Sequence, residues 1–136
     1  MFTPVFSLRP EWIHGLSGPH YKHRIQEKVT DYTIGVGISK AHLDVYLLPD
    51  GIGRQFINDR RGFVELIRWI GKRKIVRIVF EPTGAYHRAF EDALSKAGLP
   101  LAKINPLQAR RFAQARGTRA KTDKVDAEVL AVMGVA

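Results

Sequence analysis

Residues 32–58 read YTIGVGISKAHLDVYLLPDGIGRQFIN, and this stretch is the most informative part of the chain. It contains two runs rich in Ile, Val, Leu and Tyr, residues 32–39 and 42–49, which predict a hairpin of two antiparallel strands. A glycine-containing turn at 50–53 leads into a third, shorter run at 54–58. The stretch therefore predicts an antiparallel meander of three strands.

The first helix is predicted directly after the meander. Asn58 or Asp59 can cap it, Gly71 ends it, and apolar residues recur at every third or fourth position between them. These apolar residues are Phe63, Leu66, Ile67 and Ile70.

A strand and a second helix follow. Residues 74–80, KIVRIVF, are a β-branched run typical of a strand that is buried on both faces in a parallel sheet. A turn at 82–84 leads into a helix that closes at 98–100, with four apolar residues on one face. They are Tyr86, Phe90, Leu94 and Ala97.

The last part of the chain adds one strand and two helices. Residues 101–104 predict a short strand, Pro106 begins a third helix that Gly117 breaks, and Thr122 caps a final helix at 123–134. The complete order combines an antiparallel meander with parallel strands joined by right-handed crossovers. It predicts an α/β protein of the ribonuclease-H-like fold, a mixed sheet with helices on both faces.

Residues 1–30 show neither a helical nor a strand period over more than a few residues, and they hold three prolines, two glycines and three histidines. We expect an irregular N-terminal extension at 1–30, followed by one domain at 31–136. The three histidines lack acidic or thiolate companions at ligand spacing, so they do not predict a metal site.

The composition excludes several classes of protein. The 136 residues include no cysteine, which excludes disulfide scaffolds, CxxC zinc modules and thiol enzymes. No apolar run approaches the ~20 residues of a membrane span, and the N-terminus lacks the features of a secretory leader. We therefore expect a cytoplasmic protein that has no membrane partner.

The charge predicts an acidic partner. The chain has 22 Lys and Arg residues against 13 Asp and Glu, a formal net charge of +9. Nucleic acid is the commonest such partner, because binding to it releases condensed counterions, and membrane headgroups are the lesser alternative. A basic cluster between the third and last helices is the predicted nucleic-acid contact, although a solvated helix face would have the same composition. It consists of Arg110, Arg111, Arg116, Arg119, Lys121 and Lys124.

Three carboxylates stand out by position. Glu81 follows a predicted parallel strand, where ligands of open α/β sheets bind, and Asp123 and Asp126 are expected in the first turn of the last helix, on one face of it. Together they predict an all-oxygen site suited to Mg²⁺, and two such ions would serve phosphoryl transfer. Acids that only oppose the helix dipole are the alternative interpretation of Asp123 and Asp126.

Three segments, IGVGISKAHLDV at 34–45, FEPTGAYHRAFEDALSKAGLP at 80–100 and INPLQARRFAQARGTRAKTDKVDAEVLA at 104–131, resemble the N-terminal domain of the DEDD-type insertion-sequence transposases. This family includes Piv-like DNA invertases and recombinases guided by a bridge RNA. The resemblance implies a RuvC-like, ribonuclease-H-like fold in which Asp, Glu, Asp and Asp bind divalent metal. It places Glu81, Asp123 and Asp126 at three of these four positions.

Gly37 occupies the position of the first acid, and glycine has no side-chain oxygen. We expect metal affinity and activity to fall sharply. We also expect Asp44 to lie too far along the second strand to be an obvious substitute, because the family pattern has an Asp at this position in addition to the first-strand Asp. The family's C-terminal domain, which carries a serine nucleophile, follows a domain of this kind, whereas this chain ends at Ala136.

The resemblance thus implies a transposase N-terminal domain that binds nucleic acid and Mg²⁺, supports DNA transposition and recombination, and is inactive alone. Its implied partners are DNA, a guide RNA and further copies of the intact protein. The alternative is a non-catalytic RNA- or DNA-binding remnant that interferes with a full-length relative.

Overall fold

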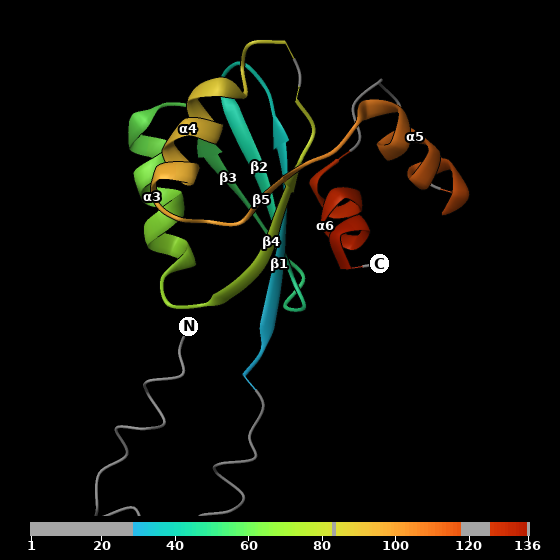
Figure 1. Ribbon diagram of the computed structural model, residues 1–136, viewed down its shortest axis with the longest axis horizontal. Helices are drawn as coiled ribbons and strands as arrows, with labels where there is room; N and C mark the ends of the chain where they lie inside the picture. Colours follow the sequence, from blue (N-terminus) through green and yellow to red (C-terminus); the bar gives the residue numbers. More distant parts are fainter. Residues whose placement is uncertain (1–28, 83, 118–125, 136) are drawn as a thin grey trace, which may run out of the picture.

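The computed structural model describes residues 29–82, 84–117 and 126–135, which contain one five-stranded sheet (Figure 1). Strands β1 (Asp31–Ile38), β2 (His42–Leu48) and β3 (Ile52–Ile57) form an antiparallel meander. Strands β4 (Lys74–Phe80) and β5 (Leu101–Lys103) run parallel to β1, and the strand order is β3-β2-β1-β4-β5. The predicted combination of a meander with parallel strands is confirmed.

Helices cover both faces of the sheet, as predicted. Helices α3 (Arg60–Ile70) and α4 (Arg88–Lys96) lie on one face, while α6 (Ala127–Val135) lies on the other with α5 (Pro106–Ala115) beside it (Figure 1). No helix within the described ranges is long and apolar enough to span a lipid bilayer.

The central strand β1 separates two apolar cores, because successive side chains of a strand point to opposite faces. Ile34, Val36 and Ile38 are at most 1% exposed and pack in the larger core with residues of α3 and α4. Gly35 and Gly37 face α6 instead. The smaller core on that side joins β4, α5 and α6 through Val79, Ala109, Ala113, Val129 and Leu130.

Helix α3 forms as its sequence predicts. The Asp59 carboxylate caps it by accepting a hydrogen bond of 2.8 Å from the Gly62 amide. Phe63, Leu66 and Ile70 are buried on the face toward the sheet. The 3.6-residue period therefore identified both the helix and its buried face.

Helix α4 begins later than predicted. A turn occupies 84–87, so the helix starts at Arg88, and Tyr86 is 48% exposed. Phe90 and Leu94 are fully buried, but Ala97 is exposed at the C-terminal end of the helix. The predicted four-residue apolar face is thus wrong at both ends, because only the two central residues reach the sheet.

Strand β4 is buried only in its carboxyl half, which corrects the prediction of burial throughout. Ile78, Val79 and Phe80 are at most 2% exposed, whereas Val76 is 40% exposed. The pairing with β1 shifts by one residue at this point, so that Val76 has no register partner. Such a bulge interrupts the alternation of side chains and leaves the extra residue outside the packed ladder.

Candidate metal and nucleic-acid site

The carboxyl ends of β1 and β4 lie side by side at one edge of the sheet, because the two strands are parallel neighbours. Val36 of β1 is the register partner of Phe80 of β4. Gly37 and Glu81 are the next residues along the two strands, and Glu81 is only 5% exposed. Glu81 therefore lies at the edge where open α/β sheets bind their ligands.

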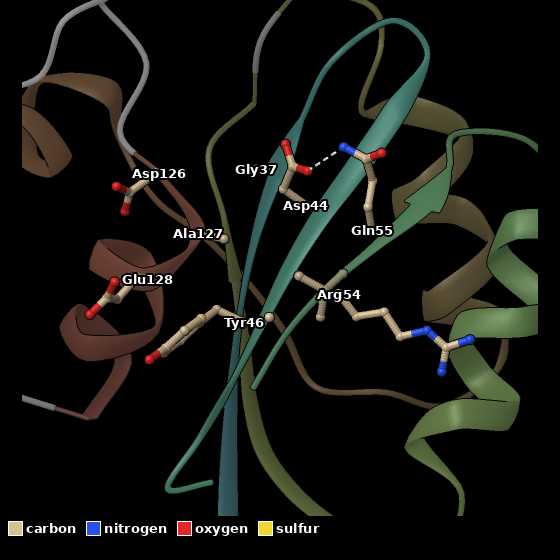
Figure 2. Close-up of a pocket in the computed structure, with 10 residues that line it drawn as sticks. Gly37, Asp44, Tyr46, Arg54, Gln55, Asp126, Ala127 and Glu128 are labelled. Carbon is tan, nitrogen blue, oxygen red and sulfur yellow. Dashed lines mark hydrogen bonds between the residues drawn. The ribbon is translucent and has the colours of Figure 1, made fainter. Parts of the chain in front are cut away.

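A pocket of about 560 Å³ opens beside Gly37, between the meander and the start of α6 (Figure 2). Its polar side chains include three carboxylates, one from β2 and two from the α6 end. Figure 2 shows Asp44 on one side of the pocket and Asp126 and Glu128 on the other. The pocket is thus bordered by acids from segments that are far apart in the sequence.

Asp126 caps α6 rather than lying within its first turn, which corrects the prediction. Its carboxylate accepts a hydrogen bond of 3.0 Å from the Val129 amide, and its carbonyl accepts one of 3.1 Å from the Leu130 amide. These are the two bonds of an N-cap residue, and the helix begins at Ala127. Asp126 therefore stabilises the start of α6, which is the structural alternative to a metal ligand. The cap uses only Oδ1 of its carboxylate. Asp123, its predicted companion, lies outside the described residues.

Gly35 is required by packing. A Cβ atom built at this position would lie 2.1 Å from the Ala127 carbonyl oxygen and 2.4 Å from the Ala131 amide nitrogen. Both atoms belong to the backbone of α6, which approaches β1 closely because residue 35 has no side chain.

Gly37, two residues further along the same face, is not required by packing. The nearest atoms to a Cβ built there are the Ala127 amide nitrogen and the Asp44 Cβ, each at 3.9 Å. This is ordinary van der Waals separation, and the backbone at Gly37 does not have a positive φ. The structure therefore has space for a side chain at Gly37, and an aspartate fits the local backbone.

Asp44 is the direct cross-strand neighbour of Gly37, so the expectation that it lies too far away is wrong. Residues opposite each other in an antiparallel pair project from the same face of the sheet. Gln55 of β3 donates a hydrogen bond of 2.8 Å from Nε2 to Asp44 Oδ1. The register of the short hairpin, counted outward from its turn, was the sequence signal that could have placed Asp44 and Gln55 at this site.

The described part of the basic cluster lies on α5 and at its C-terminal end. Ala109 and Ala113 are buried against the smaller core, whereas Arg111 and Arg116 are exposed and Arg110 is partly exposed. These three arginines form no ion pair with any described residue. Their charge is thus available to an external anion. The remaining members of the cluster, Arg119, Lys121 and Lys124, lie outside the described residues.

No group of three or more His, Asp or Glu side chains that could hold a metal ion is present within 29–82, 84–117 and 126–135. The carboxylates that border the pocket nevertheless offer only oxygen donors, on one side of the sheet. Mg²⁺ prefers oxygen ligands and is commonly bound through one or two carboxylates, with water and substrate phosphates as the other ligands. The donor set therefore fits Mg²⁺, and the open position at Gly37 leaves room for a further carboxylate.

The mixed sheet, with helices on both faces and acids at its carboxyl edge, defines a RuvC-like domain of the ribonuclease-H-like class. RuvC from T. thermophilus, solved in complex with a Holliday junction substrate, aligns with a TM-score of 0.53 and 13% sequence identity. The alignment covers 78% of this chain and 93% of that one. At this identity the likeness shows the fold, which confirms the prediction.

Comparisons of amino-acid sequence show the family to which the chain belongs. The model of the IS110-type DEDD transposases, described as a transposase, matches residues 34–135. The chain is 31% identical to the pilin gene-inverting protein of Moraxella lacunata and 30% identical to that of Moraxella bovis, in each case over 107 residues. These alignments cover 74% of this chain and 33% of each relative. The chain therefore belongs to the IS110-type DEDD transposase family, and it spans about a third of the length of the pilin gene-inverting proteins that it matches.

Proposed function

We propose that this chain is the RuvC-like domain of an insertion-sequence transposase and that it binds nucleic acid and supports metal-dependent DNA transposition or recombination within a longer protein. The observation that carries this proposal is the family match over residues 34–135. The pocket at the carboxyl edge, between Asp44 and Asp126, is the place in the domain where such chemistry would occur.

DNA is the proposed main partner. RuvC, which shares the fold, was solved with a Holliday junction substrate, and the exposed Arg111 and Arg116 have no described ion-pair partner. Arginines of this kind bind phosphate oxygens through charge-assisted hydrogen bonds. A guide RNA would present the same phosphates, so the proposal includes RNA as a second ligand of α5. We also propose that the intact protein forms homo-oligomers and works in the cytoplasm.

Mg²⁺ is the proposed cofactor. Glu81 and Asp126 would hold it, together with Asp123, whose place rests on sequence alone. When bound, the ion would stabilise negative charge on the attacking and leaving oxygens of phosphoryl transfer. The arginines of α5 would hold the phosphate backbone of the substrate, and the pocket would admit the phosphate to be cleaved.

The glycine at position 37 bears on both metal binding and DNA cleavage. Because residue 37 contributes no side-chain oxygen, we propose that the chain binds Mg²⁺ weakly and does not cleave DNA by itself. A second function, that of a non-catalytic RNA- or DNA-binding module that interferes with a full-length relative, is favoured by the same glycine.

Calorimetric titration with Mg²⁺ tests the metal site on three proteins: the natural chain, Gly37→Asp, and Gly37→Asp combined with Glu81→Gln. Each is titrated in the presence of a short DNA duplex, and thermal melting checks that each is folded. We expect Gly37→Asp to bind Mg²⁺ more tightly than the natural chain and Glu81→Gln to abolish the gain. If Gly37→Asp gains no Mg²⁺ affinity while DNA binding is retained, the metal site is refuted and the binding-module function replaces it.

Fluorescence anisotropy with a branched DNA and an RNA hairpin of equal length tests the partner. The proposal expects binding that weakens steeply with salt, because phosphate contacts release counterions. Absence of binding to both ligands at low salt would refute both proposed functions. Sedimentation velocity of the intact protein measures its oligomeric state.

A further inference from the structure

The acidic residue nearest to the open position at Gly37 is Asp44, whose Cβ lies 3.9 Å from it. We propose that Asp44 takes the place of the missing first-strand acid and, together with Asp126, binds the divalent cation of this domain. This inference rests on the proposed function, because it names a ligand of the proposed metal site. It assigns Asp44 a role in addition to its cross-strand pairing.

The distances at Gly37 support direct coordination. A carboxylate oxygen lies about 2.4 Å from its own Cβ, and an Mg–O bond adds about 2.1 Å, so a bound ion lies up to about 4.5 Å from the Asp Cβ. The point where a Cβ of residue 37 would stand is 3.9 Å from the Asp44 Cβ. A side chain at residue 37 would thus stand directly beside that of Asp44 on the same face, so the Asp44 carboxylate reaches the space beyond the Cβ point that an acid at residue 37 would fill.

Asp126 borders the same space from the opposite side. The amide nitrogen of Ala127, the next residue, is also 3.9 Å from the open Cβ position. The capping bond to Val129 uses Asp126 Oδ1 and leaves Oδ2 for a cation. Two carboxylates from opposite sides of the pocket, completed by water and a substrate phosphate, make a common Mg²⁺ ligand set.

The surroundings of Asp44 favour this role. Gln55 holds Oδ1 by its hydrogen bond and thereby orients the carboxylate, as the hydrogen-bond partners of metal ligands do. No described cation forms an ion pair with Asp44. Arg54 also lines the pocket. Its guanidinium group, however, lies 4.9 Å from the ring centroid of Phe56 and points away from Asp44 (Figure 2). The negative charge of Asp44 is therefore not neutralised within the described part of the chain.

The inference is tested by Mn²⁺ binding, which electron paramagnetic resonance measures directly and without any enzymatic activity. Four proteins form a cycle: the natural chain, Asp44→Asn, Gly37→Asp and the double variant. The amide oxygen introduced by Asp44→Asn still accepts the hydrogen bond from Gln55, so the substitution removes only the charge and one carboxylate oxygen. Asp50→Asn is the matched control, since Asp50 is an exposed acid in the β2–β3 turn and does not line the pocket.

We expect Asp44→Asn to weaken Mn²⁺ binding by about tenfold or more in the natural chain, whereas Asp50→Asn changes it by less than about twofold. In the Gly37→Asp background the effect of Asp44→Asn should fall to less than about threefold, because residue 37 then supplies the carboxylate. This dependence on residue 37 separates a ligand role from general electrostatic attraction.

Three results would overturn the inference: an unchanged Mn²⁺ affinity in Asp44→Asn, an equal loss in Asp50→Asn, or an equal effect of Asp44→Asn in both backgrounds. Measurements of DNA binding on the same samples distinguish this failure from that of the proposed function. If Gly37→Asp binds Mn²⁺ and DNA binding is intact while Asp44→Asn has no effect, only the inference on Asp44 fails. If none of the proteins binds either Mn²⁺ or DNA, the proposed function fails with it.

Discussion

Two glycines on the same face of β1 should respond in opposite ways to substitution by alanine. In Gly35→Ala the new methyl group would lie 2.1 and 2.4 Å from backbone atoms of α6, so the helix must move away from the strand. Overpacking of this kind costs about 1–3 kcal/mol, and we expect the upper end because backbone atoms cannot rotate aside. In Gly37→Ala the methyl group has no neighbour closer than 3.9 Å. Loss of backbone freedom in the unfolded chain should then leave stability unchanged or raise it by up to about 1 kcal/mol.

The two variants differ from the natural chain by one methyl group each and from one another only in position, so each is the control of the other. Thermal unfolding followed by circular dichroism measures the effect. A change of 1 kcal/mol shifts the melting temperature of a domain of this size by about 4–8 °C, so Gly35→Ala should melt at least about 10 °C lower. Hydrogen exchange should show the loss in α6, whose Leu130 is fully buried in the natural chain.

A melting temperature of Gly35→Ala within about 2 °C of that of the natural chain would refute the close packing of α6 on residue 35. A loss of stability in Gly37→Ala as large as that in Gly35→Ala would refute the difference between the two positions. The second result would mean that Gly37 is kept by packing, and Gly37→Asp would then be a poor way to restore a metal ligand.

Three further predictions concern the cap, the basic helix and the core. Asp126→Ala should lower the free energy of unfolding in urea by about 1 kcal/mol, because α6 loses its cap, whereas Asp126→Asn should retain it; equal losses would contradict the capping role. Arg111→Ala should reduce the slope of log affinity for DNA against log salt by about one, and an unchanged slope would show that Arg111 does not contact phosphate. Leu66→Ala should cost about 2–5 kcal/mol, since Leu66 is fully buried, while Val64→Ala, at a residue 48% exposed, should change stability by less than about 0.5 kcal/mol; comparable losses would contradict the packing of α3.

The elements that sequence patterns predicted well are those with local causes. The period of α3 and its Asp59 cap were visible in a short run of consecutive residues, and the same is true of the strands of the meander. The patterns failed at the start of one helix and at an irregular strand pairing, both of which depend on other segments of the chain. Tyr86 fits the apolar period of α4 but lies before the helix, and Val76 fits the apolar run of β4 but stands in a bulge.

The residues of the candidate site divide in the same way, into those that a local sequence pattern marks and those that only the tertiary structure places. Glu81 was identified because it follows a buried parallel strand, and Asp126 because it precedes an apolar helix. The position of Asp44 is not visible in a local sequence pattern, because its distance along the chain from Gly37 conceals their direct pairing across two strands. No local pattern marks Glu128, because only the packing of α6 on β1 brings it to the pocket.

The amino-acid sequence by itself determined the order of strands and helices, the basic charge and the absence of a side-chain oxygen at residue 37. Backbone dihedral preferences, side-chain periodicity and composition act over a few residues and need no partner. Only the tertiary structure decided that Gly35 is indispensable, that Gly37 has space for a side chain and that Asp44 lies beside it. Those three facts depend on strand register and on the distance between α6 and β1, which are set by packing between segments from opposite ends of the domain.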